Sequence, residues 1–241
     1  MPAVAVTGPD ALLERCAPSG PGFTRVSPED LAGVSFDAVV AFGADATLSE
    51  KVAALGRPAL LWLDGPGSGP PAVGPVRLVA DDDRAWRRLP LPVADELFGP
   101  AARQTGVGWL GGDCERRREY MRWFGDGSPI SETGETADVA VNLHDRPGVT
   151  FEQRALVALA QGRLLISETL SPSRGLEPGT DYLEARDLTD VFHAVANATR
   201  TPHAFRRVRL RGRQKAELFR ASAVVGRLAE DLLLELAAPA R

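Results

Sequence analysis

The part of the chain best equipped for chemistry lies in its second half, where an apolar run ends in polar side chains. Asn142 and His144 close this run, a Pro-Gly turn follows, and Thr150 and Arg154 stand where a helical pattern begins. Open α/β sheets bind ligands at the carboxyl ends of their strands, next to helix N-termini. Thr150 can cap the helix, and Arg154, one turn further on, can make a bidentate phosphate contact. An ordinary surface loop with a solvated arginine is the alternative, and local features alone do not separate the two.

A second candidate is a turn with paired glycines. Gly111 and Gly112 follow the apolar run Val107–Leu110 and precede a helical pattern. Glycine lets the backbone approach a ligand closely, and the N–H groups at the start of a helix attract anions. Many α/β folds need glycine here for the turn alone, so this motif is weak evidence by itself.

Three aspartates in a row, Asp81–Asp83, raise the question of a metal site, because carboxylates hold Mg²⁺ or Mn²⁺ against a diphosphate. They follow an apolar run and precede Arg84–Arg88, which has a helical pattern. Aspartate is a good helix cap and favours the positive end of the helix. Capping is therefore the preferred interpretation, and we expect no metal site.

Other catalytic signatures are absent from the sequence. It contains three histidines but no Gly-x-Ser-x-Gly elbow, and no Gly-x-Gly-x-x-Gly follows the first apolar run. Cys16 and Cys114 stand nearly a hundred residues apart, without the spacing of a zinc site or a disulfide framework. We therefore expect neither a dinucleotide nor another cofactor.

The composition is that of an ordinary globular protein. Of 241 residues, 44% are hydrophobic and 25% are charged, and the formal net charge of −4 argues against a nucleic-acid partner. The basic stretch Arg206–Arg213 is interpreted as a solvated surface, with a phosphate-facing edge as the alternative. No run approaches the length of a membrane span, and the first residues do not resemble a signal peptide, which favours the cytoplasm.

Apolar runs alternate with helical patterns along most of the chain, which predicts βαβ units and a parallel sheet, hence an α/β fold. The predicted strands are Val4–Thr7, Ala38–Phe42, Ala59–Leu63, Val76–Ala80, Val107–Leu110, Val139–Leu143, Leu164–Ser167 and Tyr182–Glu184. The predicted helices are Pro9–Cys16, a segment capped at Asp45 and ending at Leu55, Glu115–Phe124, Phe151–Gln161, Leu188–Thr199 and Gln214–Leu236.

A break rich in proline and glycine at Pro90–Gly106 divides the chain into two predicted domains. The first comprises residues 1–98, and the second comprises residues 99–241, including the closing helices. The last helix carries a stripe of apolar residues at helical spacing. This stripe is expected to pack on the core of its own chain, with a contact in a homodimer as the alternative.

Four motifs, in order along the chain, resemble the C-terminal part of GT-B glycosyltransferases of the group 1, spore-maturation type. They are Leu89–Phe98, Val107–Gly112 with Arg118–Met121, Val141–His144 with Arg154 and Ala158–Ser167, and Gly175–Leu183. The likeness extends over roughly Leu89 to Leu233.

This resemblance implies two small Rossmann-like domains and the transfer of a hexose from a nucleotide-sugar to an unknown acceptor without a metal. Cationic side chains and a helix dipole would then stabilise the departing diphosphate. The residues implied for nucleotide-sugar binding are Arg154 at the diphosphate, Thr150 at the helix start, Asn142 and His144 along the cleft wall, Gly111 and Gly112 at a close backbone approach, and Asp181 at the acidic position of the fourth motif.

The sequence also departs from this family. Where the family has a ribose-binding glutamate three residues after the arginine, this chain has Val157, and a second acidic position is occupied by Val149. The region before Leu89 is short, and a strand–helix unit is missing between Phe124 and Ala137. These departures favour an alternative, a degenerate GT-B protein that binds a nucleotide or serves as the non-catalytic partner of an active glycosyltransferase. An unrelated doubly wound binding protein is the third possibility.

Overall fold

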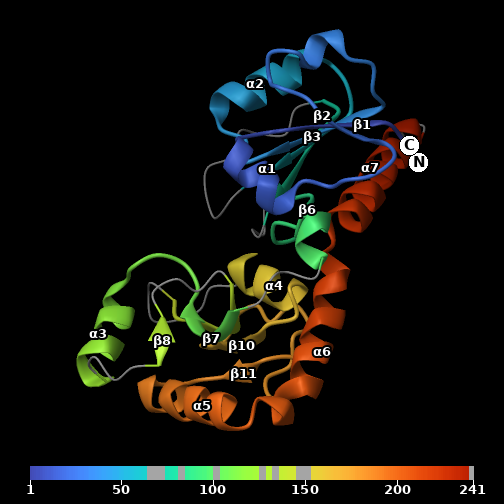
Figure 1. Cartoon of the computed structure of the whole chain (residues 1–241). Coiled ribbons are helices and arrows are strands. Elements are labelled where there is room, and N and C mark those ends of the chain that lie inside the picture. Colours follow the sequence, from blue (N-terminus) through green and yellow to red (C-terminus); the bar gives the residue numbers. More distant parts are fainter. Residues whose placement is uncertain are drawn as a thin grey trace. The chain divides into compact units, whose positions relative to one another are not determined.

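The computed structural model describes residues 1–63, 74–80, 85–99, 104–124, 129–131, 136–144 and 153–238. The chain forms two compact units, each built on its own sheet (Figure 1). Unit 1 comprises Met1–Glu96 and Phe219–Arg241, and unit 2 comprises Leu97–Leu218.

Unit 1 is a six-stranded parallel sheet in the order β2-β1-β3-β4-β5-β6. Its strands are β1 (Val4–Thr7), β2 (Phe23–Arg25), β3 (Ala38–Phe42), β4 (Ala59–Trp62), β5 (Val76–Ala80) and β6 (Arg87–Arg88). Its helices are α1 (Asp10–Cys16), α2 (Ala46–Ala54) and α7 (Ala221–Ala237), with short 3₁₀ turns at Leu31–Gly33 and Asp95–Phe98, the latter crossing into unit 2.

Helices cover both faces of the sheet of unit 1. The central strands β1, β3 and β4 are buried along their whole length, as continuous apolar runs in a parallel sheet require. Helix α2 packs on one face, and Asp45 caps it by accepting a hydrogen bond of 2.8 Å from the Leu48 N–H. Helices α1 and α7 pack on the other face (Figure 1).

Unit 2 is a five-stranded parallel sheet in the order β11-β10-β9-β7-β8. Its strands are β7 (Gln104–Trp109), β8 (Ile130–Ser131), β9 (Ala137–Asn142), β10 (Leu164–Ser167) and β11 (Leu183–Glu184). Its helices are α3 (Glu115–Phe124), α4 (Gln153–Ala160), α5 (Leu188–Arg200) and α6 (Arg206–Ala216).

The side chains of unit 2 alternate between two helical layers. On one face, the odd-numbered residues Val139 and Val141 of β9 join a core with Tyr120 of α3 and Val191 of α5. On the other face, α6 lies so close to α4 that a Cβ on Gly212 would come within 2.6 Å of the Leu159 side chain. This alternation decides which helix each residue at the strand ends can reach.

The basic stretch Arg206–Arg213 lies in helix α6, and two of its arginines bind the C-terminal end of α4. Its composition did not predict this contact. Arg213 donates hydrogen bonds to the carbonyl oxygens of Ala160 and Phe98, and Arg209 donates to Gly162. Since the last carbonyls of a helix have no partner within it, these arginines complete the end of α4.

The C-terminal segment differs most from its prediction. Instead of one helix over Gln214–Leu236, α6 ends at Ala216, a 3₁₀ turn follows at Glu217–Phe219, and α7 begins at Ala221. Helix α7 packs on unit 1, whereas the sequence analysis placed it in the second domain. The reason is that Val225, Leu228 and Leu232 fit the core of unit 1.

Two shorter segments also differ from their predictions. The stretch interpreted as helical before Leu89 ends in strand β6, and strand β8 lies in the interval where the strand–helix unit is missing. Both are two-residue edge strands, which carry little apolar signal. The predicted α/β class, with two parallel sheets flanked by helices, is confirmed. No helix within the described ranges is long and apolar enough to cross a membrane.

Candidate functional site

The sheet of unit 2 has a topological switch point between β7 and β9. The chain passes from β7 outward to β8, then returns to the opposite side of β7 to form β9, β10 and β11. The connections that leave the carboxyl ends of β7 and β9 therefore diverge. A crevice forms at such a point in open α/β sheets, and ligands bind there.

The guanidinium group of Arg154 lies at this switch point, although its backbone belongs to α4. Its Nε donates a hydrogen bond of 2.8 Å to Oδ1 of Asn142, and its Nη2 donates one of 3.1 Å to the carbonyl oxygen of Leu143. Asn142 is the last residue of β9, and Leu143 follows it. The end of β9 thus holds the half-buried guanidinium in one orientation.

Gly111, in the turn that follows β7, lies directly against the guanidinium of Arg154. Its φ is +82°, a conformation that side-chain-bearing residues rarely adopt, and a Cβ there would overlap the guanidinium of Arg154. Gly112, by contrast, has no atom within 4 Å of the corresponding position. The structure therefore brings Arg154, Asn142 and Gly111 together, and it requires glycine at only one of the two positions.

A chain of polar contacts fixes Asn142. The residue is fully buried, and its Nδ2 donates a hydrogen bond of 3.1 Å to Ser167 Oγ at the end of β10. Ser167 Oγ in turn donates to the carbonyl oxygen of Glu168 at 2.8 Å. Because the amide nitrogen is engaged by Ser167, the amide oxygen must face Arg154.

His144 lies beside this network but is buried, with 2% of its surface exposed. Its Nε2 is 3.2 Å from the carbonyl oxygen of Thr169. A carbonyl only accepts hydrogen bonds, so the contact requires a proton on Nε2. The ring is therefore oriented by the segment that follows β10.

Two residues of the site escaped sequence analysis, Glu168 and Arg116. Glu168 directly follows β10, is 9% exposed, and forms an ion pair with Arg116 of α3. Its Oε2 also accepts a hydrogen bond of 2.7 Å from the backbone N–H of His144. The available signal was a carboxylate at the end of a buried apolar strand, which is a place where ligand sites form.

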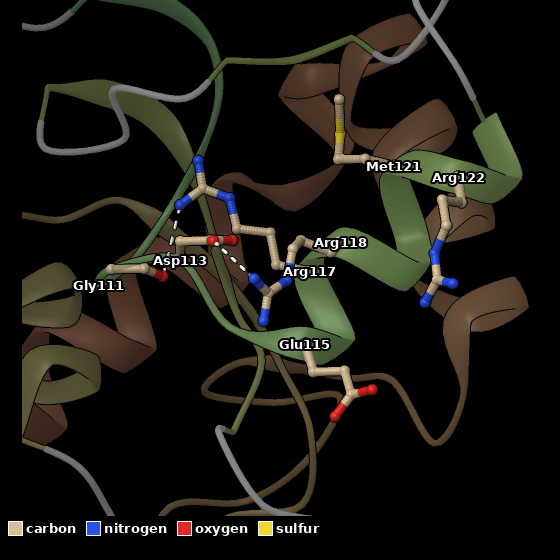
Figure 2. A pocket seen from close by; sticks show the side chains of 8 residues that line it. Gly111, Asp113, Glu115, Arg117, Arg118, Met121 and Arg122 are labelled. Carbon is tan, nitrogen blue, oxygen red and sulfur yellow. Dashed lines mark hydrogen bonds and ion pairs between the residues drawn. The ribbon is translucent and has the colours of Figure 1, made fainter.

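A cavity of about 1200 Å³ extends from the glycine turn along α3. Figure 2 shows Arg117 and Arg118 reaching back toward this turn, whereas Arg122 points away from it. Arg117 donates to the Gly112 carbonyl oxygen at 3.5 Å, and Arg118 pairs with Asp113 at 3.4 Å. The cavity is lined by Gly111, Gly112, Asp113, Glu115, Arg117, Arg118, Met121 and Arg122.

Asp181 is the remaining predicted site residue that the structure describes. Asp181 is fully buried, accepts a hydrogen bond of 3.0 Å from the Glu177 N–H, and lies 3.6 Å from Arg211 of α6. These partners place it among the contacts that hold its own loop to α6, and its role in nucleotide-sugar binding stays a prediction. Thr150, Val149 and Asp81–Asp83 are outside the described residues. Within the described ranges, no three His, Cys, Asp or Glu side chains lie together as metal ligands would.

The arrangement suits an anion. A guanidinium is positively charged, and in a partly buried position such as that of Arg154 a charge is less screened than at the surface. The glycine turn beside it carries no side chain that would block an approaching phosphate. The basic groups of α3 add positive charge along the adjoining cavity.

The sequence matches no known protein family, and no curated protein resembles it closely enough to count as a relative. Its structure is similar to that of HepE from Anabaena, determined with UDP and glucose. The identity is 9%, the TM-score is 0.57, and the match covers 95% of this chain and 99% of that one. It is also similar to an α1,3-fucosyltransferase at 7% identity and a TM-score of 0.50, over 86% of this chain and 80% of that one. At these identities the likeness concerns the fold, and the fold of this chain is that of the GT-B glycosyltransferases.

Proposed function

We propose that the protein is a glycosyltransferase that takes a hexose from a nucleotide-sugar, with the diphosphate bound at the switch point of unit 2. The observation that carries the proposal is the fixed guanidinium of Arg154 against the bare backbone of Gly111. A group oriented in advance loses little conformational freedom on binding, which favours tight recognition. The fold supports the same function, because one structural neighbour was determined with UDP and glucose and another is an α1,3-fucosyltransferase.

Within this proposal, Arg154 contacts the diphosphate, and Asn142 orients the arginine. Gly111 and Gly112 offer backbone N–H groups, and Thr150, which is outside the described residues, precedes α4 in the sequence. His144 forms part of the wall beside the sugar. As the bond to the sugar breaks, negative charge grows on the leaving diphosphate, and a fixed cation stabilises that charge more than it stabilises the ground state.

The proposed transfer needs no metal ion, because arginines supply the positive charge that a divalent cation supplies in other enzymes. Arg117 is the second cation of this kind, since it reaches over the turn that carries Gly112. Its guanidinium also lies 5.5 Å from the centre of the Trp109 ring. Transfer rates should then be the same with EDTA as with added Mg²⁺ or Mn²⁺, and strict dependence on a divalent ion would refute this part of the proposal.

One observation favours a second candidate, a GT-B protein that binds a nucleotide without turning over a sugar. Val157 lies on α4 one turn after Arg154 and is half-buried. A valine cannot accept hydrogen bonds from ribose hydroxyl groups, each of which contributes about 0.5–1.5 kcal/mol. Nucleotide binding without transfer or hydrolysis of UDP-, GDP- and TDP-sugars would select this second function, in which the protein is a partner of an active transferase.

The test of the proposed function compares two arginine variants by titration calorimetry with UDP, GDP and TDP. Arg154→Ala removes the fixed guanidinium and should weaken the binding of the preferred nucleotide roughly 10- to 100-fold, the effect of losing charge-assisted hydrogen bonds. Arg207→Ala is the matched control, because Arg207 is exposed on α6, and its affinity should equal that of the wild type. Equal affinities for all three proteins would refute the role of Arg154. No binding by the wild type would refute the function itself.

A further inference from the structure

We propose that Glu168 is a positioning residue, which sets the orientation of Arg154 through a single peptide group. The inference rests on the proposed function only in naming a diphosphate as the ligand. The geometry behind it is independent of any ligand, and it concerns the peptide that joins Leu143 to His144.

The two ends of this peptide group are held by opposite charges. Its N–H donates a hydrogen bond of 2.7 Å to the carboxylate of Glu168, and its C=O accepts one of 3.1 Å from the guanidinium of Arg154. A peptide group is planar and rigid, and in the trans form its C=O and N–H point in opposite directions. Whatever fixes the direction of the N–H therefore fixes the direction of the C=O that Arg154 contacts.

The strands explain how two residues on opposite sides can share one peptide. Asn142 and Ser167, at the ends of adjacent strands, point to the α4 side, where Arg154 originates. Glu168 is the next residue after Ser167, so its side chain points to the opposite side and meets Arg116 of α3. The Leu143–His144 peptide lies between them, and Glu168 and Arg154 hold it from the two faces of the sheet.

A second hydrogen bond also connects Glu168 to the residues that hold Arg154. The backbone N–H of Glu168 donates a hydrogen bond of 3.2 Å to the carbonyl oxygen of Asn142, the residue whose side chain holds the Nε of Arg154. Glu168 therefore contacts the backbone on both sides of Leu143. Hydrogen bonds in such a chain polarise one another, so the negative carboxylate at one end strengthens the contact with the positive guanidinium at the other.

Arg116 keeps the carboxylate suited to this role. The side chain of Glu168 is only 11% exposed, and a buried carboxylate needs partners for its oxygens. Arg116 supplies one partner through the ion pair, and the His144 N–H supplies another through its hydrogen bond to Oε2. The three consecutive arginines of α3 thus serve different purposes, because Arg116 supports Glu168 while Arg117 and Arg118 reach the glycine turn.

The test uses two variants of Glu168 and one control. Glu168→Ala removes both side-chain contacts, whereas Glu168→Gln keeps an oxygen for the His144 N–H and loses the ion pair. Asp138→Asn is the control, since it disturbs an ion pair with Arg209 on the same unit, near the opposite end of β9. Affinities for UDP and GDP are compared with those for uridine and guanosine, which lack the diphosphate.

Glu168→Ala should weaken the binding of the preferred diphosphate about tenfold, and Glu168→Gln about threefold, because an unsatisfied N–H and a misplaced guanidinium each reduce affinity. The affinity for the bare nucleoside and all affinities of Asp138→Asn should stay unchanged. A general loss of folding would lower nucleoside and diphosphate binding alike, and the glutamine variant tests the same role under a milder change. Unchanged diphosphate affinity in both Glu168 variants would overturn the inference.

A second readout separates this inference from the proposed function. The Nε–H of Arg154, bonded to Asn142, should give a slowly exchanging signal in ¹⁵N-arginine NMR spectra of the protein without ligand. In Glu168→Ala that signal should shift and exchange faster, while in Asp138→Asn it should be unchanged. If the wild type binds no diphosphate but the signal responds in this way, the function fails and the positioning role stands. An unaltered signal in Glu168→Ala overturns the positioning role in either case.

Discussion

The switch points of the two sheets have the same topology and opposite chemistry. In unit 1 the switch point lies between β1 and β3, where a Cβ on Gly8 would come 2.6 Å from the Phe42 carbonyl oxygen. The Phe42 and Trp62 rings stack 5.4 Å apart at the ends of their strands. Thr7 Oγ1 is buried without a hydrogen-bond partner among the described residues. Among the described residues, backbone and aromatic rings pack closely at this edge.

In unit 2 the corresponding edge is polar and charged. The guanidinium of Arg154 occupies the place beside Gly111, and Asn142 and Glu168 hold it there. A half-buried arginine and a buried carboxylate at a strand end are weak evidence for a role in stability, because hydrophobic side chains of similar volume often stabilise as well. Two switch points of the same topology therefore differ in their side chains, and among the described residues the one in unit 2 carries groups suited to an anion.

The largest loss of stability is expected from a substitution of Trp62, which is packed at the end of β4 in unit 1. Trp62→Ala should lower the free energy of unfolding by about 3–5 kcal/mol, because it leaves a large cavity under the edge. Trp62→Phe should cost less than about 1.5 kcal/mol, since the ring volume is largely kept and Trp62 Nε1 has no hydrogen-bond partner among the described residues. Urea unfolding measures both. A phenylalanine variant as unstable as the alanine variant would mean that the edge depends on the indole N–H.

The next largest effect is expected at the glycine turn of unit 2, where Gly111 and Gly112 should respond differently to substitution. Gly111→Ala should lower stability by about 1–3 kcal/mol and diphosphate affinity at least tenfold, because its positive φ is strained and its Cβ displaces Arg154. Gly112→Ala is the matched control. It has open space around the new methyl group and should change stability by less than about 0.5 kcal/mol. Similar losses in both variants would contradict the assigned geometry.

A pair of substitutions compares the two edges directly. Asn142→Leu removes the acceptor for Arg154 and should lower stability by about 1–3 kcal/mol, together with diphosphate affinity. Thr7→Val, at the end of β1 beside the switch point of unit 1, replaces a buried hydroxyl that has no partner among the described residues by a methyl group. It should be neutral or stabilising by up to about 1 kcal/mol. A destabilising Thr7→Val would mean that the edge of unit 1 also carries a polar contact.

The smallest effect on stability is expected from Glu235, a charged residue of unit 1 that lies on α7, away from the switch point. A hydrogen bond from Arg77, a second one from Trp86 and nearby charges lower the pKa of Glu235 on α7. A lowered pKa means that this contact stabilises the fold above the ordinary pKa of glutamate and that the contribution is lost as pH falls through the folded value. Glu235→Gln should therefore slightly lower the Tm at pH 7 and leave it unchanged near pH 2. A loss of equal size at both pH values would show that the charge plays no part.

Most of the fold could be predicted from patterns that are local in sequence. Strands β1, β3 and β5 were predicted at their observed bounds because each is an apolar run with clear flanking signals. The cap at Asp45 was predicted because the chemistry of a helix start involves neighbours in sequence. The strand Arg87–Arg88 was missed because it is a short edge strand with exposed side chains, which leaves no apolar trace.

The candidate site could be predicted only in part. Asn142 and Arg154 were identified from their place at a strand end and a helix start, and they do meet. Glu168 was missed because its importance depends on a backbone N–H from another strand, which no spacing along the chain reveals. The division of the last helix was missed for a similar reason. Leu218 fits a helical stripe in sequence, but it is exposed where the chain turns from α6 to α7.

The most direct test of the account is an experimental structure of the protein with UDP or GDP, whichever binds more tightly. The diphosphate oxygens should lie within hydrogen-bond distance of the Arg154 guanidinium and next to the backbone of Gly111. Arg154 should keep its contacts with Asn142 and the Leu143 carbonyl. A diphosphate bound away from the ends of β7 and β9, or an Arg154 turned away from it, would contradict the central claim.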